Sequence, residues 1–264
     1  MNFLFYLVKW LTGSKRQSYG DDVIQVVKPR LDVDSVIKEI IRIGDEDDPF
    51  YVCEVNDIIR RHEEWEAAMP RVTTHYAVKC NSSKVVLQTL AALGTGFDCA
   101  SKEEIRTVLS LGVRPDRIIF AHPTKMVSHL KYAADVGVTM MTFDNDYELQ
   151  KNQERLSTGQ VRSIYIILLI RIKYDDLSAR YLLGQKYGCD HEKEARDLLL
   201  KASSLKLDVV GVCFHIGSSS KDHSVFRRAI AAARQVYDEA ADLGFNFKLL
   251  DIGGGFPGEK KEVY

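Results

Sequence analysis

Short apolar runs rich in β-branched and aromatic residues recur along the chain, and amphipathic stretches lie between them. Runs that are apolar on both faces are typical of parallel strands covered on both sides. The pattern predicts seven core strands, at residues 76–80, 96–100, 117–121, 139–143, 164–172, 208–215 and 248–252. A separate lead-in strand is predicted at residues 51–53.

The stretches between the strands carry apolar residues at helical spacing. Ser101 and Glu104 fit a capping box, which marks the start of a helix. Further helices are predicted at residues 85–93, 126–136, 191–205 and 225–243. Glycine stands where helix C-caps are expected, at Gly94, Gly112, Gly137 and Gly244.

Alternation of strands and helices indicates an α/β fold, either a doubly wound sheet or a (β/α)8 TIM barrel. A dinucleotide-binding sheet carries GxGxxG after its first strand, and the sequence has none there. We therefore predict a barrel domain at residues 49–264, after an N-terminal arm and lead-in helix at residues 1–48. With seven core strands, we expect the barrel to be one strand short.

Composition and charge limit the partners and the cellular location that we expect for the protein. The chain has 264 residues, is 45% hydrophobic and has a formal net charge of −1. This balance argues against nucleic-acid and membrane-surface partners. No apolar run reaches transmembrane length, and we expect the apolar residues 1–11 to form a packing arm rather than a membrane-surface anchor. The five scattered cysteines include no CxxC pair, so we expect reduced thiols in a cytoplasmic protein and no metal site.

Candidate chemistry gathers at the predicted strand ends, where barrel enzymes carry their active sites. A lysine that closes an apolar strand is well placed for covalent chemistry through its amine, although lysines are often simply solvated. The other candidates also have ordinary alternatives, such as capping aspartates, an ion-paired arginine or a core histidine. The residues at the strand ends are Lys79, Asp98, His122, Asp144, Arg171, His215, Gly253, Gly254 and Gly255.

Three consecutive glycines follow the last predicted strand. Gly253, Gly254 and Gly255 let the backbone approach a ligand and expose successive N–H groups, which suits phosphate. His215 and Ser218 close the preceding strand with an imidazole and a hydroxyl. A strand-end lysine together with a phosphate nest indicates pyridoxal 5'-phosphate as cofactor.

Six sequence motifs are similar to those of one known protein family, and the similarity spans residues 49–258. They are HYAVKCN at 75–81, GTGFDCAS at 94–101, VSHLKYAA at 127–134, GVTMMTFD at 137–144, DVVGVCFHIGS at 208–218 and LLDIGGGFPG at 249–258. The chain thereby resembles the eukaryotic ornithine decarboxylase family of fold-type III pyridoxal-phosphate decarboxylases, whose barrel is similar to that of alanine racemase. The resemblance implies decarboxylation of L-ornithine to putrescine in polyamine biosynthesis.

The resemblance also implies roles for individual residues. Lys79 would hold the cofactor as a Schiff base, and His215 would stack on its ring. Asp98 and Glu104 would belong to the charged, cofactor-binding network beside Lys79, and Arg171 would lie near the cofactor. Its phosphate would be bound by Ser218, Gly253, Gly254 and Gly255. Lys186 matches a lysine that packs against the partner subunit in family homodimers.

Some positions depart from the family pattern. His122 stands where asparagine is usual, Leu182 where arginine is usual, and Ser219 where glycine is usual. We expect the family's eighth strand and C-terminal β-domain to lie outside these 264 residues. By the resemblance, those parts would carry the carboxylate for the pyridine nitrogen, the catalytic cysteine and the substrate-selecting acids. We therefore expect little or no decarboxylase activity from the 264-residue chain alone.

Two alternatives stay open. The chain could be a non-catalytic regulator that binds antizyme through residues 125–144, with Lys125, Lys131 and Tyr132 on the binding surface. The ordinary alternative for these three residues is a solvated helix face. The second alternative is a decarboxylase of the same fold for diaminopimelate, arginine or lysine.

Overall fold

The computed structural model describes residues 4–5, 16–19, 22–25, 32–44, 49–157, 166–177, 179, 181–218, 220 and 222–256. The chain forms two compact units. The first combines Met1–Thr73 with Asn81–Gly94, and the second combines Thr74–Cys80 with Thr95–Tyr264. The predicted domain boundary after residue 48 stays a prediction.

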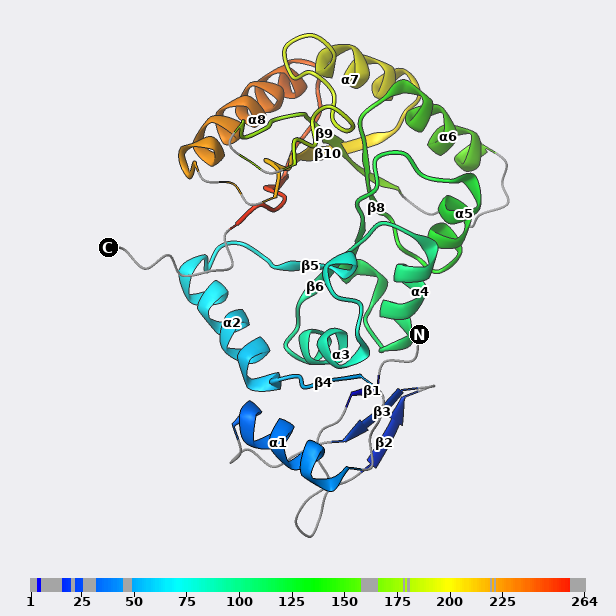
Figure 1. Ribbon diagram of the computed structural model, residues 1–264. Coiled ribbons are helices and arrows are strands. Elements are labelled where there is room, and N and C mark those ends of the chain that lie inside the picture. Colours follow the sequence, from blue (N-terminus) through cyan, green and yellow to red (C-terminus); the bar gives the residue numbers. More distant parts are fainter. Residues whose placement is uncertain are drawn as a thin grey trace. The chain divides into compact units, whose positions relative to one another are not determined.

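The second unit is built on one parallel sheet, whose strands follow one another in chain order. The strands are β5 (His75–Ala77), β6 (Gly96–Cys99), β7 (Ile118–Phe120), β8 (Met140–Phe143), β9 (Ile167–Arg171), β10 (Asp208–Cys213) and β11 (Leu249–Asp251). The sheet curls around a centre, as Figure 1 shows. The prediction of an incomplete α/β barrel with seven core strands is confirmed for the described residues.

Burial on both faces explains why these apolar runs become strands. Phe97, Phe120, Phe143 and Leu168 lie in four neighbouring strands and have no exposed surface. Removing each such side chain from water contributes about 1.5–3 kcal/mol. The sheet is therefore held mainly by the apolar positions that the sequence pattern identified.

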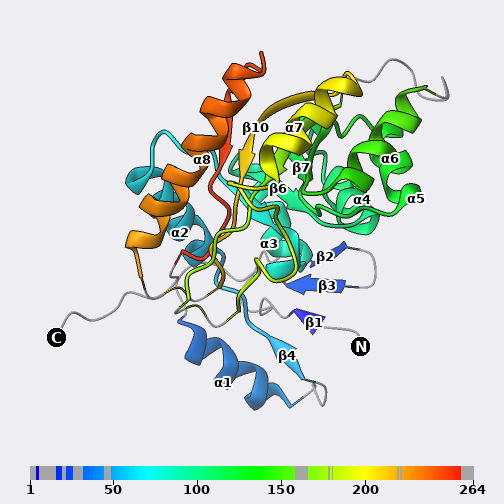
Figure 2. The same cartoon turned by 90° about the horizontal axis from the view of Figure 1, so that it is seen from above.

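Five helices of this unit lie along the outer side of the curled sheet (Figures 1 and 2). They are α4 (Lys102–Ser110), α5 (Val127–Asp135), α6 (Asp146–Ser157), α7 (Ala195–Ser204) and α8 (Ser224–Asp242). A 3-10 turn, η2 (Pro115–Arg117), precedes β7. Gly112, Gly137 and Gly244 have φ of 82°, 83° and 85°, which confirms them at helix C-termini.

The capping box at α4 is confirmed with one difference. The Ser101 hydroxyl accepts from the Glu104 amide at 3.2 Å, as predicted. The Glu104 carboxylate accepts from the amide of Ala100 at 2.5 Å, one residue before the position that the motif predicts.

The strand predicted at residues 76–80 is wrong in its second half. Strand β5 ends at Ala77, and the 3-10 turn η1 (Val78–Cys80) follows. Lys79 therefore lies in a turn beyond the strand, which frees its side chain from the alternation of a strand. Helix α6 was not predicted, because its buried positions include the polar residues Glu148 and Asn152.

The first unit contains the predicted lead-in helix and strand. Helix α1 (Val33–Ile43) is capped by Asp32, which accepts from the Ser35 amide at 2.8 Å, and it buries Val36 and Ile40 against Phe50 and Val52. The remaining elements are β1 (Leu4–Phe5), β2 (Arg16–Tyr19), β3 (Asp22–Gln25), β4 (Phe50–Tyr51), α2 (Val55–Ala68) and α3 (Lys84–Ala92). Strands β1 and β4 pair in parallel, and β2 and β3 pair antiparallel.

All five cysteines are free, as predicted. None of the helices in the described ranges has the length and apolarity that a bilayer crossing needs. The predicted arm at residues 1–11 lies outside the described residues, apart from the two that form β1.

Candidate active site

The predicted site residues of the second unit meet at the carboxyl edge of the sheet. Lys79 follows β5, Asp98 lies in β6, Arg171 ends β9 and His215 follows β10. Strands β5 and β11 are at opposite ends of the hydrogen-bonded order. The sheet nevertheless curls, so that its two ends face one centre (Figure 1). Burial lowers the pKa of His215, beyond β10, and the charges of Arg171 and Lys79 lower it further.

Lys79 and Asp98 form an ion pair at this centre. The Lys79 Nζ lies 3.4 Å from the Asp98 Oδ2, and their side chains are 59% and 27% exposed. A pair this exposed contributes little to stability, so the amine can exchange its partner at small cost. The other carboxylate oxygen, Asp98 Oδ1, is buried and accepts no hydrogen bond from the described residues. Such an acceptor fits a donor supplied by a ligand.

His215 presents a neutral ring to the site. Burial, with smaller contributions from Arg171 and Lys79, lowers the pKa of His215 to about 4. Its Nδ1 accepts from the Gly217 amide at 3.0 Å, so the neutral ring carries its hydrogen on Nε2. A neutral, oriented imidazole is suited to lie against a flat aromatic ring.

The glycine loop after β11 (Gly253, Gly254 and Gly255) packs tightly on the segment after β10. A Cβ at Gly253, whose φ is +64°, would lie 2.0 Å from the Phe214 carbonyl oxygen. A Cβ at Gly254 would lie 2.9 Å from the His215 Nε2. The Gly253 amide donates to the Asp251 Oδ1 at 2.8 Å. The amides of Gly254 and Gly255 have no protein acceptor among the described residues, so this cradle fits a phosphate.

Glu104 and Arg171 flank the centre in different ways. The Glu104 carboxylate is held by the Ala100 amide and so serves as a helix cap. The Arg171 guanidinium lies 5.0 Å from the centroid of the Tyr187 ring. Ser218 forms an isolated antiparallel bridge with Tyr181. Direct contacts of these residues with a cofactor stay predictions.

Two further strand-end residues support the loop at residues 184–189. The Asp144 Oδ2 accepts from the Gly188 amide at 2.8 Å. The His122 ring meets the Tyr187 ring edge-on, with centroids 5.7 Å apart, and burial lowers the pKa of His122. Both residues therefore shape the edge of the site. Lys186 is exposed beside Tyr187, and Ser219 lies outside the described residues.

The prediction that Lys125 belongs to a binding surface is wrong. The side chains of Lys125 and Glu148 have no exposed surface, and the Lys125 Nζ lies 2.8 Å from the Glu148 Oε1. It also donates to the Thr142 carbonyl at 2.6 Å. The sequence could not reveal this partner, because Glu148 lies 23 residues further along the chain. Lys131 is exposed, and Tyr132 is half-buried.

Sequence reasoning missed two carboxylates near the site. Asp251 ends β11, and burial raises its pKa while its Oδ1 fixes the glycine loop. Its position two residues before Gly253 is the signal of an Asx turn. Asp176 is buried in the segment after β9. No local pattern marks it, since its partners lie beyond β10.

The site's geometry agrees with what known proteins indicate. Residues 55–263 match the family model described as "Pyridoxal-dependent decarboxylase, pyridoxal binding domain". The chain belongs to this family. The cofactor of the domain is accordingly pyridoxal phosphate, which fits the glycine cradle and the unpartnered Asp98 oxygen.

Individual relatives are similar over most of the chain. Rat ornithine decarboxylase (Rattus norvegicus) is 47% identical over 228 residues, which are 86% of this chain and 48% of that protein. Antizyme inhibitor 2 of Xenopus laevis is 45% identical over 226 residues, with the same shares. The chain spans about half the length of these curated relatives.

Solved structures of other decarboxylases have the same fold as this chain over most of its length. The arginine decarboxylase of Paramecium bursaria Chlorella virus superposes with a TM-score of 0.81 at 37% identity, over 87% of this chain and 60% of that one. A lysine/ornithine decarboxylase of Vibrio vulnificus, complexed with putrescine, superposes with a TM-score of 0.75 at 28% identity, over 88% of this chain and 60% of that one.

Proposed function

We propose that this chain is the cofactor-binding portion of a cytoplasmic decarboxylase that converts L-ornithine to putrescine. The convergence of Lys79, Asp98, His215 and the glycine loop at one edge of the sheet carries the proposal. The identity of 47% to rat ornithine decarboxylase supports ornithine as the substrate.

The residues have separate tasks in this proposal. Lys79 supplies the amine that attaches the cofactor, and Asp98 holds that amine until the attachment forms. The neutral His215 packs on the ring without adding positive charge. The free amides of the glycine loop, together with Ser218, bind the phosphate. Bound pyridoxal phosphate supplies an electron sink for the charge left when the substrate loses its carboxylate.

The experiment compares substrates on the purified chain with saturating cofactor. L-Ornithine, L-arginine, L-lysine and diaminopimelate are supplied with labelled carboxylates, and released carbon dioxide is counted. We expect a low rate that is highest with ornithine and absent in Lys79→Ala. Lys193→Ala, which removes an exposed lysine, is the control and keeps the rate. Faster release from another substrate, or unchanged release from Lys79→Ala, would refute the proposal.

A second candidate is a non-catalytic regulator that binds antizyme. The identity of 45% to a Xenopus antizyme inhibitor supports it. Capture of purified antizyme, with no carbon dioxide released from any substrate, would favour the regulator. Lys131→Glu would weaken such capture if the exposed face of α5 is the contact, whereas the buried Lys125 cannot take part in it directly.

We further propose that the chain assembles as a homodimer in its functional state. The exposed Lys186 is the candidate for a contact with the second copy. Sedimentation of wild-type and Lys186→Glu proteins tests this, and the variant is expected to shift toward monomer.

A further inference from the structure

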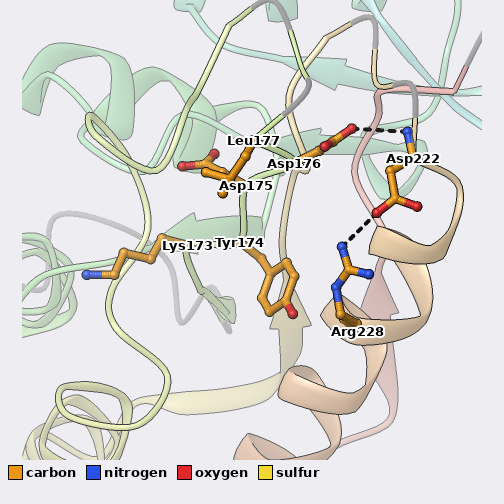
Figure 3. A pocket seen from close by; sticks show the side chains of 7 residues that line it. All are labelled: Lys173, Tyr174, Asp175, Asp176, Leu177, Asp222 and Arg228. Atoms are coloured by element: carbon orange, nitrogen blue, oxygen red, sulfur yellow. Dashed lines mark hydrogen bonds and ion pairs between the residues drawn. The ribbon is translucent and has the colours of Figure 1, made fainter.

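Asp176 connects the segments that follow β9 and β10. It is only 4% exposed, and a buried carboxylate is costly unless it accepts hydrogen bonds. Its Oδ2 accepts from the Ser220 hydroxyl at 2.5 Å and from the Asp222 amide at 3.4 Å. Figure 3 shows Asp176 directed toward Asp222, with this second contact drawn as a dashed line.

The backbone of Asp176 makes another contact with the same segment. Its amide donates to the Ile216 carbonyl at 2.9 Å. Gly217 and Ser218 stand in the chain between Ile216 and Ser220. Asp176 therefore holds the chain on both sides of this pair, which we call the Gly217/Ser218 turn.

The turn has little room to move. Gly217 has a φ of +99°, and a Cβ on it would lie 2.6 Å from the Tyr181 carbonyl oxygen. On the other side, a Cβ at Gly255 would lie 2.4 Å from the Gly217 carbonyl oxygen. The turn thus lies between the segment after β9 and the glycine loop. A change in the hydrogen bonds that hold the turn would therefore also move Ser218 relative to the glycine amides.

We propose that Asp176 is a positioning residue for phosphate, because it holds the Gly217/Ser218 turn against the glycine loop. This rests on the proposed cofactor site and adds a residue that lies behind the phosphate-binding groups. The carboxylate has its own hydrogen-bond donors in Ser220 and Asp222, so it does not compete with the phosphate for the glycine amides.

The hollow beside Asp176 is a poor alternative place for an anion. It is open, has a volume of about 700 Å³ and is lined by Lys173, Tyr174, Asp175, Asp176, Leu177, Asp222 and Arg228 (Figure 3). Its two cations are already paired within the protein. Arg228 lies 2.8 Å from the Asp222 carboxylate, and Lys173 lies 3.2 Å from that of Asp190.

The test compares two ligands that differ only in the phosphate. The full chain is titrated with pyridoxal phosphate and with pyridoxal, and thermal unfolding is recorded in parallel. We expect Asp176→Ala to raise the Kd for pyridoxal phosphate about tenfold and that for pyridoxal less than about twofold, as loss of a charge-assisted hydrogen bond implies. Asp176→Asn keeps an acceptor and restores most of the affinity.

Two more variants keep the test decisive. Ser220→Ala removes one donor to Asp176 and is expected to give the same selective loss, even if Asp176→Ala fails to fold. Asp190→Asn, a change on the same segment, is expected to leave both affinities unchanged. Equal losses for both ligands, in Ser220→Ala or Asp176→Ala, would overturn the positioning role. Wild-type chain that binds neither ligand would instead contradict the proposed cofactor site.

Discussion

At the residue scale, burial and neighbouring charges set the state of the groups in the site. His215 is neutral at pH 7 because burial and two nearby cations disfavour its charged form. Lys79 is paired but exposed, so it stays available to a ligand. The candidate site thus combines an exposed, ion-paired amine with an uncharged imidazole ring of fixed tautomer.

The lowered pKa of His215 predicts a loss of stability in acid. Below pH 6.5 the His215 side chain of the unfolded chain binds a proton, whereas in the folded protein it stays neutral down to about pH 4. The free energy of unfolding therefore falls as the pH falls between these values. Urea titration should show that His215 accounts for about 2 kcal/mol of the loss between pH 7 and pH 5. In His215→Gln, the loss of stability between pH 7 and pH 5 should be smaller by about 2 kcal/mol. His223→Gln changes an exposed histidine and should keep the full loss.

At the scale of elements, the apolar pattern located every core strand, because strands buried on both faces leave a strong local signal. The strand-end positions of Asp98, Arg171, His215 and the glycine loop followed from it. The observed end of a strand differs from the predicted one where a turn takes the place of the last strand residues, as at Lys79. Helix α6 could not be predicted, because its buried positions include the polar residues Glu148 and Asn152. The burial of Lys125 could not be predicted, because it depends on an ion pair between distant segments.

The buried ion pair predicts a specific cost for Lys125→Met. Glu148 would lose one of two cations and keep only Lys151, which lies 2.5 Å from its Oε2. We expect the free energy of unfolding to fall by about 3 kcal/mol, measured by urea denaturation. Lys131→Met, at an exposed position of α5, should stay within about 0.5 kcal/mol of wild type. Similar values for the two variants would contradict the burial of Lys125.

The glycine loop predicts a difference between two glycine-to-alanine substitutions. Gly112→Ala, with a φ of +82° and no atom within 4 Å of the new Cβ, should cost about 1 kcal/mol from its backbone conformation alone. Gly253→Ala adds a clash with the Phe214 carbonyl, and we expect a cost of about 3 kcal/mol or more. Equal costs in urea denaturation would show that the loop does not pack on the segment after β10.

At the scale of the whole molecule, the curl of the parallel sheet is what makes a site. It brings the turn after β5 and the loops after β10 and β11 to one centre, although these strands are far apart in the hydrogen-bonded order. A flat sheet of the same strands would leave Lys79 and the glycine loop at opposite edges. The fold and the family membership together identify a pyridoxal-phosphate-binding domain.

The attachment of the cofactor to Lys79 tests this account most directly. The purified chain is incubated with pyridoxal phosphate, reduced with borohydride, digested and analysed by mass spectrometry. We expect the reduced cofactor on the peptide that carries Lys79, and no such modification in Lys79→Ala under the same conditions. Modification of another lysine with Lys79 unmodified, or no modification at all, would contradict the account.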